Sequence, residues 1–114
     1  MKPIETTRLR LRELAPADAP FILELLNDPD WIRNIGDRGV RTLEGAEAYI
    51  VKGPMGMYAK HGFGLWLVED RSGTPMGMCG LIKRDTLEDV DLGFAFMPPF
   101  RGKGYAREAS EASR

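Results

Sequence analysis

The residues best suited to chemistry lie in residues 89–108, DVDLGFAFMPPFRGKGYARE. The pattern predicts a strand, a basic loop with two glycines, and the start of a helix. Gly102 and Gly104 allow the backbone to turn tightly and to approach a ligand closely. The first amides of a helix are unpaired, and its dipole is positive there. Formal charge is added by Arg101, Lys103 and Arg107. The stretch therefore predicts a phosphate or pyrophosphate site, although a solvated turn with a basic rim explains the same pattern.

Composition excludes several other kinds of site. The 114 residues carry a net charge of −1, so no global attraction to nucleic acid or anionic lipid is expected. Cys79 is the single cysteine and His61 the single histidine, which excludes an internal disulfide and a Cys- or His-rich metal cluster. Apolar runs are too short to span a membrane, and the start lacks the apolar core of a signal peptide. We therefore expect a cytoplasmic protein without a metal, a membrane partner or a nucleic-acid partner.

The rest of the sequence predicts the elements that hold this stretch. Alternating residues predict strands at residues 8–14, 63–69 and 90–96, and a run that is apolar on both faces predicts a central strand at residues 75–82. Helical spacing predicts helices from Pro16 to the NDPD motif and from Thr42 to the KGPMG motif. Residues 31–41 are expected to form a loop, and residues 52–62 a flexible link. The order indicates an α/β (α+β) domain with a mixed, largely antiparallel sheet and flanking helices.

Three segments resemble a known family. Residues 101–106, RGKGYA, match the pattern Q/R-x-x-G-x-G/A of the GNAT N-acetyltransferase superfamily. TTRLRLREL as a first strand, PFILELLNDPD as a first helix and DLGFAFMPPFRGKGYAREA resemble its ribosomal-protein N-terminal acetyltransferase (Rim-type) branch. The resemblance covers essentially the whole chain, in the family's order.

The resemblance implies a GNAT-like fold and an acetyl-CoA-dependent N-acetyltransferase. A primary amine, either a protein N-terminal α-amine or a small amine, would attack the thioester directly. Phe96 and Met97 would border the pantetheine arm. They end the segment that begins at Phe94, whose main chain would hydrogen-bond this arm. The resemblance assigns the CoA pyrophosphate to Arg101, Gly102, Lys103, Gly104, Tyr105 and Ala106.

Other candidate residues have less specific signals. Many relatives place a glutamate where Asp91 stands, so Asp91 is the candidate general base, with Glu88 and Asp89 behind it; all three also suit a solvated strand end. Trp31 and Tyr58 are expected in loops that line the acceptor pocket. We expect His61 to be solvated and Cys79 to pack as a small hydrophobe. A single wet strand face accounts for Arg8, Arg10 and Arg12.

In the resembled family, a fifth strand, another helix and two more strands follow the pyrophosphate helix. Residues 1–114 are therefore expected to form a single acyl-CoA N-acyltransferase-like domain, truncated after that helix and without the C-terminal strands. Strand 90–96 would then present an exposed apolar edge, which predicts a homodimer or a domain swap. Two alternatives stay open: a non-catalytic CoA- or phosphate-binding half-domain that dimerises, and an RNA- or ribosome-binding element.

Overall fold

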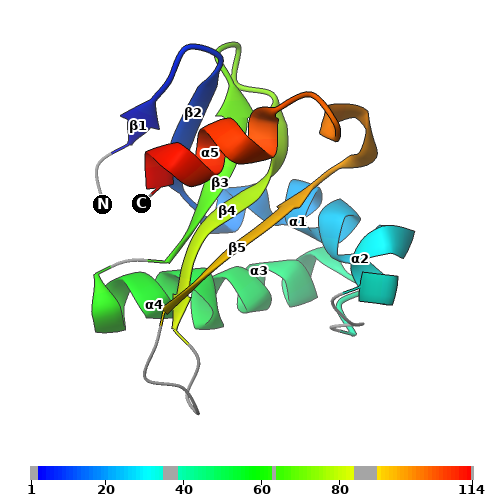
Figure 1. Ribbon diagram of the computed structural model, residues 1–114. Coiled ribbons are helices and arrows are strands. Elements are labelled where there is room, and N and C mark those ends of the chain that lie inside the picture. Colours follow the sequence, from blue (N-terminus) through cyan, green and yellow to red (C-terminus); the bar gives the residue numbers. More distant parts are fainter. Residues whose placement is uncertain (1–2, 35–38, 63, 84–89, 114) are drawn as a thin grey trace.

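The computed structural model describes residues 3–34, 39–62, 64–83 and 90–113, with the backbone alone at 34, 81–83, 90–94 and 113. Its sheet has the strand order β1-β2-β3-β4-β5, and every neighbouring pair is antiparallel (Figure 1). The five strands are β1 (Ile4–Glu5), β2 (Leu9–Glu13), β3 (Leu65–Asp70), β4 (Pro75–Lys83) and β5 (Val90–Phe96). The predicted fold class is confirmed, and among the described strands the sheet is wholly antiparallel.

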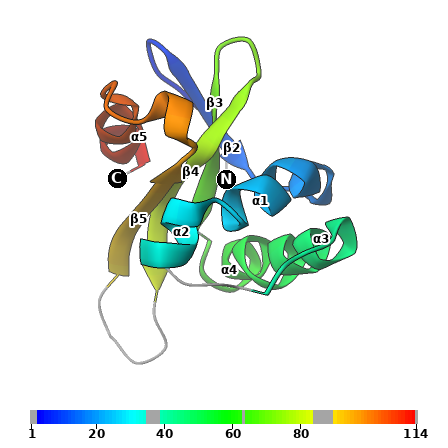
Figure 2. The ribbon, with the colours of Figure 1, turned by 90° about the vertical axis from the view of Figure 1, so that its right-hand side faces the viewer.

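Helices cover both faces of this sheet. Figure 2 shows α5 on one side and α1 to α4 on the other. The helices are α1 (Ala19–Leu26), α2 (Pro29–Asn34), α3 (Leu43–Lys52), α4 (Pro54–His61) and α5 (Tyr105–Ser113). None of them, within the described residues, has both the length and the apolar character needed to cross a membrane. The result is a three-layer arrangement in which both sheet faces become core.

Each face of the sheet has its own apolar core. Leu67 and Met78 pack under α1 and α3 with Ile22 and Ile50. On the opposite face, a second cluster under α5 contains Leu9, Leu11, Trp66, Val68, Met76, Cys79, Phe96 and Ala109. Residues 66–68 of β3 therefore alternate between the two cores, whereas in β4 the register shift opposite Val68 and Glu69 places Met76 and Met78 on opposite faces. This confirms the prediction that residues 75–82 form a central strand.

Two segments expected to be irregular are helical. The sequence predicted a loop at residues 31–41, but α2 occupies its first part, because Pro29 suits a helix start and Asp28 accepts the Trp31 N–H at 3.2 Å as a cap. The predicted flexible link at residues 52–62 contains α4, which begins at Pro54 and ends at His61, followed by Gly62 in the left-handed conformation (φ +73°). The proline and glycine signals thus delimit short helices.

Candidate functional site

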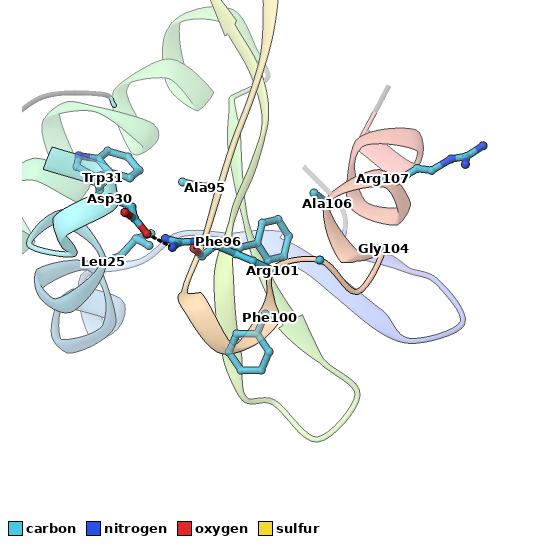
Figure 3. Close-up of a pocket in the computed structure, with 11 residues that line it drawn as sticks. Leu25, Asp30, Trp31, Ala95, Phe96, Phe100, Arg101, Gly104, Ala106 and Arg107 are labelled. Atoms are coloured by element: carbon cyan, nitrogen blue, oxygen red, sulfur yellow. Dashed lines mark hydrogen bonds and ion pairs between the residues drawn. The ribbon is translucent and has the colours of Figure 1, made fainter. Parts of the chain in front are cut away.

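A cavity of about 670 Å³ lies where β5 ends (Figure 3). One wall comes from α1 and α2 and includes Leu25, Asp30 and Trp31. Ala95 and Phe96 of β5 lie between this wall and the other, which is formed by Phe100, the glycine loop and the start of α5. The cavity therefore joins the sheet edge to the loop that the sequence singled out.

The loop beside this cavity has unpaired amides. Gly102 and Gly104 have φ values of +73° and +81°, which side-chain-bearing residues rarely adopt. The first α-helical bond of α5 runs from the Glu108 N–H to the Gly104 carbonyl, at 3.1 Å. Before that bond, in the described part of the chain, no acceptor is found for the amides of Gly102, Lys103, Gly104, Tyr105 and Ala106. These donors at a helix N-terminus suit an anion.

The loop begins at an arginine that is fully engaged by the protein. Arg101 donates through Nη2 to Asp28 (2.8 Å), through Nη1 to Asp30, and through Nε to the Phe96 carbonyl (2.8 Å). Its own amide donates to the Pro98 carbonyl (3.2 Å). Burial alone would raise the pKa of Asp28, but hydrogen bonds from Arg101 and from the Trp31 amide lower it below its usual value. Asp28 is therefore ionised at neutral pH.

A second arginine holds the other end of the loop. Arg8 donates to the Lys103 carbonyl (3.0 Å) and to Glu108 (2.7 Å), and its guanidinium lies 4.4 Å from the centre of the Tyr105 ring. Burial would raise the pKa of Glu108, but hydrogen bonds from Thr6 and Arg8 lower it. The prediction that Arg8 lies on a merely wet strand face is therefore incomplete, because this side chain joins β2 to α5.

Fewer of the positively charged side chains at the loop lack a carboxylate partner than the sequence suggested. Arg107 pairs with Glu111 of its own helix at 3.2 Å, and both side chains are exposed. Among the described residues, no carboxylate partner is found for Lys103, which is exposed. An anion at this site would therefore meet main-chain donors and at most one uncompensated lysine.

The structure brings together some predicted residues and separates others. Trp31, 7% exposed, lines the cavity from α2. Tyr58 does not line it: its hydroxyl donates to the Leu65 carbonyl and accepts the Leu14 N–H at 3.0 Å. His61 ends α4, away from the cavity lining. Cys79 is buried with its sulfur 3.7 Å from the Ser110 hydroxyl, which agrees with a packing role.

Several expectations concern residues beyond what is described. Glu88 and Asp89 lie outside the described residues. Asp91 pairs with Ile82 in the sheet register, and its side chain lies outside the described part. Met97 donates its amide to the Met76 carbonyl at 2.9 Å, which continues the β4–β5 pairing to the cavity. Within the described residues, no group of three metal-ligating side chains is found.

The chain belongs to the GNAT acetyltransferase family. The acetyltransferase (GNAT) domain model matches residues 8–114. An acetyltransferase from Agrobacterium tumefaciens str. C58 superposes with a TM-score of 0.80 at 24% identity, and the match covers 100% of this chain and 65% of that one.

Two further solved structures have the same fold and different named acceptors. RimL, a ribosomal L7/L12 α-N-protein acetyltransferase in complex with coenzyme A, has a TM-score of 0.73 and 16% identity over 96% of this chain and 63% of its own. A chimera of the spermidine N-acetyltransferase SpeG from Vibrio cholerae and hSSAT has a TM-score of 0.66 and 21% identity. The match covers 90% of this chain and 58% of the chimera. At these identities the likeness shows the fold and does not single out the Rim-type branch. The chain spans less than two thirds of each structure.

Proposed function

We propose that this domain binds acetyl-CoA and transfers its acetyl group to a primary amine by direct attack on the thioester. Family membership supports the reaction class. The observation that carries the proposal is the cavity at the end of β5, which reaches a glycine loop with unpaired amides. Pyrophosphate is the kind of anion that such a helix start binds well.

Different residues are proposed to bind different parts of acetyl-CoA. The amides of Gly102, Lys103, Gly104, Tyr105 and Ala106 are proposed to hold the pyrophosphate, with Arg101 at the start of the same loop. Phe96, which lines the cavity, and Met97 are proposed to border the pantetheine arm. No metal takes part in this proposal, because the chemistry requires only amine deprotonation and stabilisation of a developing oxyanion by a main-chain N–H.

Asp91 is the proposed general base. A primary amine has an unperturbed pKa of about 10 and must lose a proton before it attacks. A carboxylate on β5 accepts that proton directly or through a water. Replacing Asp91 by Asn should therefore lower kcat and shift the activity profile to higher pH, while leaving acetyl-CoA binding unchanged. An unchanged profile would remove Asp91 from the mechanism.

The acceptor belongs to one of two classes. RimL is named for a protein α-amine and SpeG for spermidine, so both classes of amine occur on this fold. Release of the CoA thiol, measured with a panel of N-terminal peptides and with polyamines, would separate them. Calorimetric binding of acetyl-CoA with no release for any amine would instead support the non-catalytic CoA-binding alternative.

Binding is tested first, with a matched pair of glycine variants. Gly102 and Gly62 share a φ of +73° and have no atoms within 4 Å of an added Cβ, but only Gly102 lines the cavity. Replacing either residue by Ala forces a left-handed conformation that costs about 1–2 kcal/mol. We expect calorimetry to show weaker acetyl-CoA binding for Gly102→Ala and wild-type binding for Gly62→Ala. Equal affinities would show that the loop is only a turn.

A further inference from the structure

Arg101 is directed away from the amides that are proposed to bind the pyrophosphate. In Figure 3 its side chain extends from the loop toward Asp30, on the side opposite Gly104 and the start of α5. All three kinds of guanidinium nitrogen donate to groups of the protein: Nη2 to Asp28, Nη1 to Asp30 and Nε to the Phe96 carbonyl. A phosphate could gain this arginine only if those bonds were broken.

The two carboxylates differ in how firmly they are held. The Asp28 side chain is 7% exposed and also accepts the Trp31 N–H, so it is fixed at the start of α2. The Asp30 side chain is 44% exposed and is shared with Arg33 at 2.8 Å. Together they supply two negative charges to one guanidinium. Arg101 is therefore compensated electrostatically and has little attraction left for a third anion.

The contact with Phe96 connects this ion pair to the geometry of the loop. Phe96 is the last residue of β5, and the Arg101 Nε reaches back across the η2 turn (Pro98–Phe100) to its carbonyl. The hydrogen bond from Arg101 to Phe96 thereby closes the turn between β5 and the two glycines of the loop. At the far end, the Arg8–Lys103 hydrogen bond fixes the same loop from β2.

We propose that Arg101 is a positioning residue: Asp28 and Asp30 of the α2 region hold its guanidinium on the Phe96 carbonyl, and this fixes the glycine loop in its ligand-binding conformation. This inference rests on the proposed function, because its ligand is acetyl-CoA. It makes the α2 wall, which also contributes Trp31 to the cavity, a determinant of acetyl-CoA affinity.

Asparagine substitutions give opposite results for the two roles of Arg101. If Arg101 bound phosphate directly, Asp28→Asn or Asp30→Asn would release it and strengthen acetyl-CoA binding. For a positioning residue, each substitution should raise the Kd, Asp28→Asn by about tenfold and Asp30→Asn by less, because a charged hydrogen bond is lost. Asparagine still caps α2 in place of Asp28. Glu47→Gln on α3 is the control for the change in net charge.

Arg101→Lys provides a second discriminating variant. Lysine binds phosphate as a point charge but lacks the planar group that reaches three acceptors. We expect Arg101→Lys to bind acetyl-CoA as poorly as Arg101→Ala. Retention of most of the affinity by the lysine variant would overturn the positioning role.

A measurement without ligand keeps the two proposals distinguishable. Hydrogen exchange at the Phe100 and Glu108 amides of the unliganded chain, which bond to the Met97 and Gly104 carbonyls at the two ends of the loop, should accelerate in Asp28→Asn and Arg101→Lys but not in Glu47→Gln. Unchanged exchange, or tighter acetyl-CoA binding by the asparagine variants, would overturn the positioning role alone. If the wild-type chain did not bind acetyl-CoA but the exchange difference were present, the proposed function would be overturned. The role of Asp28, Asp30 and Arg101 in holding the loop would still stand.

Discussion

The Tyr58 hydroxyl should make the stability of the domain sensitive to alkaline pH. It donates to the Leu65 carbonyl at the start of β3 and accepts the Leu14 N–H, so one side chain of α4 satisfies the main chain of two other segments. Burial raises the pKa of Tyr58 to about 12. The unfolded chain titrates tyrosine near 10. The folded state therefore holds this proton more tightly than the unfolded state.

The contribution of the Tyr58 hydroxyl to the free energy of unfolding follows from the difference between its folded and unfolded pKa values. A difference of about two pKa units corresponds to about 2.7 kcal/mol. Solvent contact of the half-buried ring reduces this contribution to about 2 kcal/mol. The contribution is complete below pH 10 and is lost as the pH rises toward 12. Tyr58→Phe should cost about 1–3 kcal/mol at neutral pH, because the Leu14 N–H and the Leu65 carbonyl lose their partner. It should also remove this component of the alkaline decline.

Urea unfolding followed by circular dichroism at a series of pH values measures both effects. Tyr105→Phe is the control, because it also removes one tyrosine hydroxyl and leaves the ring contacts of this residue with Phe100 and Arg8 in place. The wild-type and Tyr105→Phe proteins should lose stability more steeply above pH 10 than Tyr58→Phe. Parallel curves for wild type and Tyr58→Phe would refute the role given to this hydroxyl.

Three further outcomes are expected. Gly77→Ala should destabilise the fold by more than about 2 kcal/mol in thermal unfolding, since a Cβ there would overlap the Ala95 carbonyl and lie 2.8 Å from the Phe96 Cα, whereas a Cβ at Gly56 in α4 would meet its nearest atom at an ordinary 3.7 Å. Glu108→Gln should flatten the loss of stability in acid, because the lowered pKa of Glu108 contributes stability that is present above its unfolded value near 4 and is lost as the pH falls; an unchanged acid slope would contradict this. Light scattering should detect a dimer of the 114-residue chain, because β5 is the last strand of the described sheet and has one unpaired edge; a monodisperse monomer would count against it.

The strands were predictable because burial of one or both faces leaves a direct trace in sequence. Alternation at residues 8–14 and 63–69 predicts β2 and β3 to within a few residues, and the continuous apolar run at 75–82 predicts a strand covered on both sides. The N-cap at Thr42 also predicts the start of α3, where its hydroxyl accepts the Gly45 N–H at 3.0 Å. These signals depend on neighbours within a few residues along the chain.

The short helices were not predictable from the same signals. Both α2 and α4 have fewer than three turns, and proline and glycine at their borders read equally well as loop residues. What stabilises them lies elsewhere in the chain: Arg101 binds Asp28 and Asp30 of the α2 region, and Leu14 and Leu65 bind Tyr58 of α4. The two-residue strand β1 was also missed, since it pairs over only two positions with β2.

The glycine loop of the proposed site was predicted from sequence, but the positive charge available at the loop was overestimated. In the sequence, the formal charges of Arg101, Lys103 and Arg107 are added to the unpaired amides and the dipole of the helix start. The structure pairs Arg101 with two carboxylates from 70 or so residues earlier in the chain, and Arg107 with Glu111. A local count could have registered Glu111, four residues from Arg107, but it cannot register Asp28 and Asp30, which only the fold brings to Arg101. In the proposed site, a pyrophosphate would meet amides whose positions depend on Gly102, Gly104 and the hydrogen bonds of Arg8 and Arg101, so we expect the two arginines to serve the site by holding its backbone.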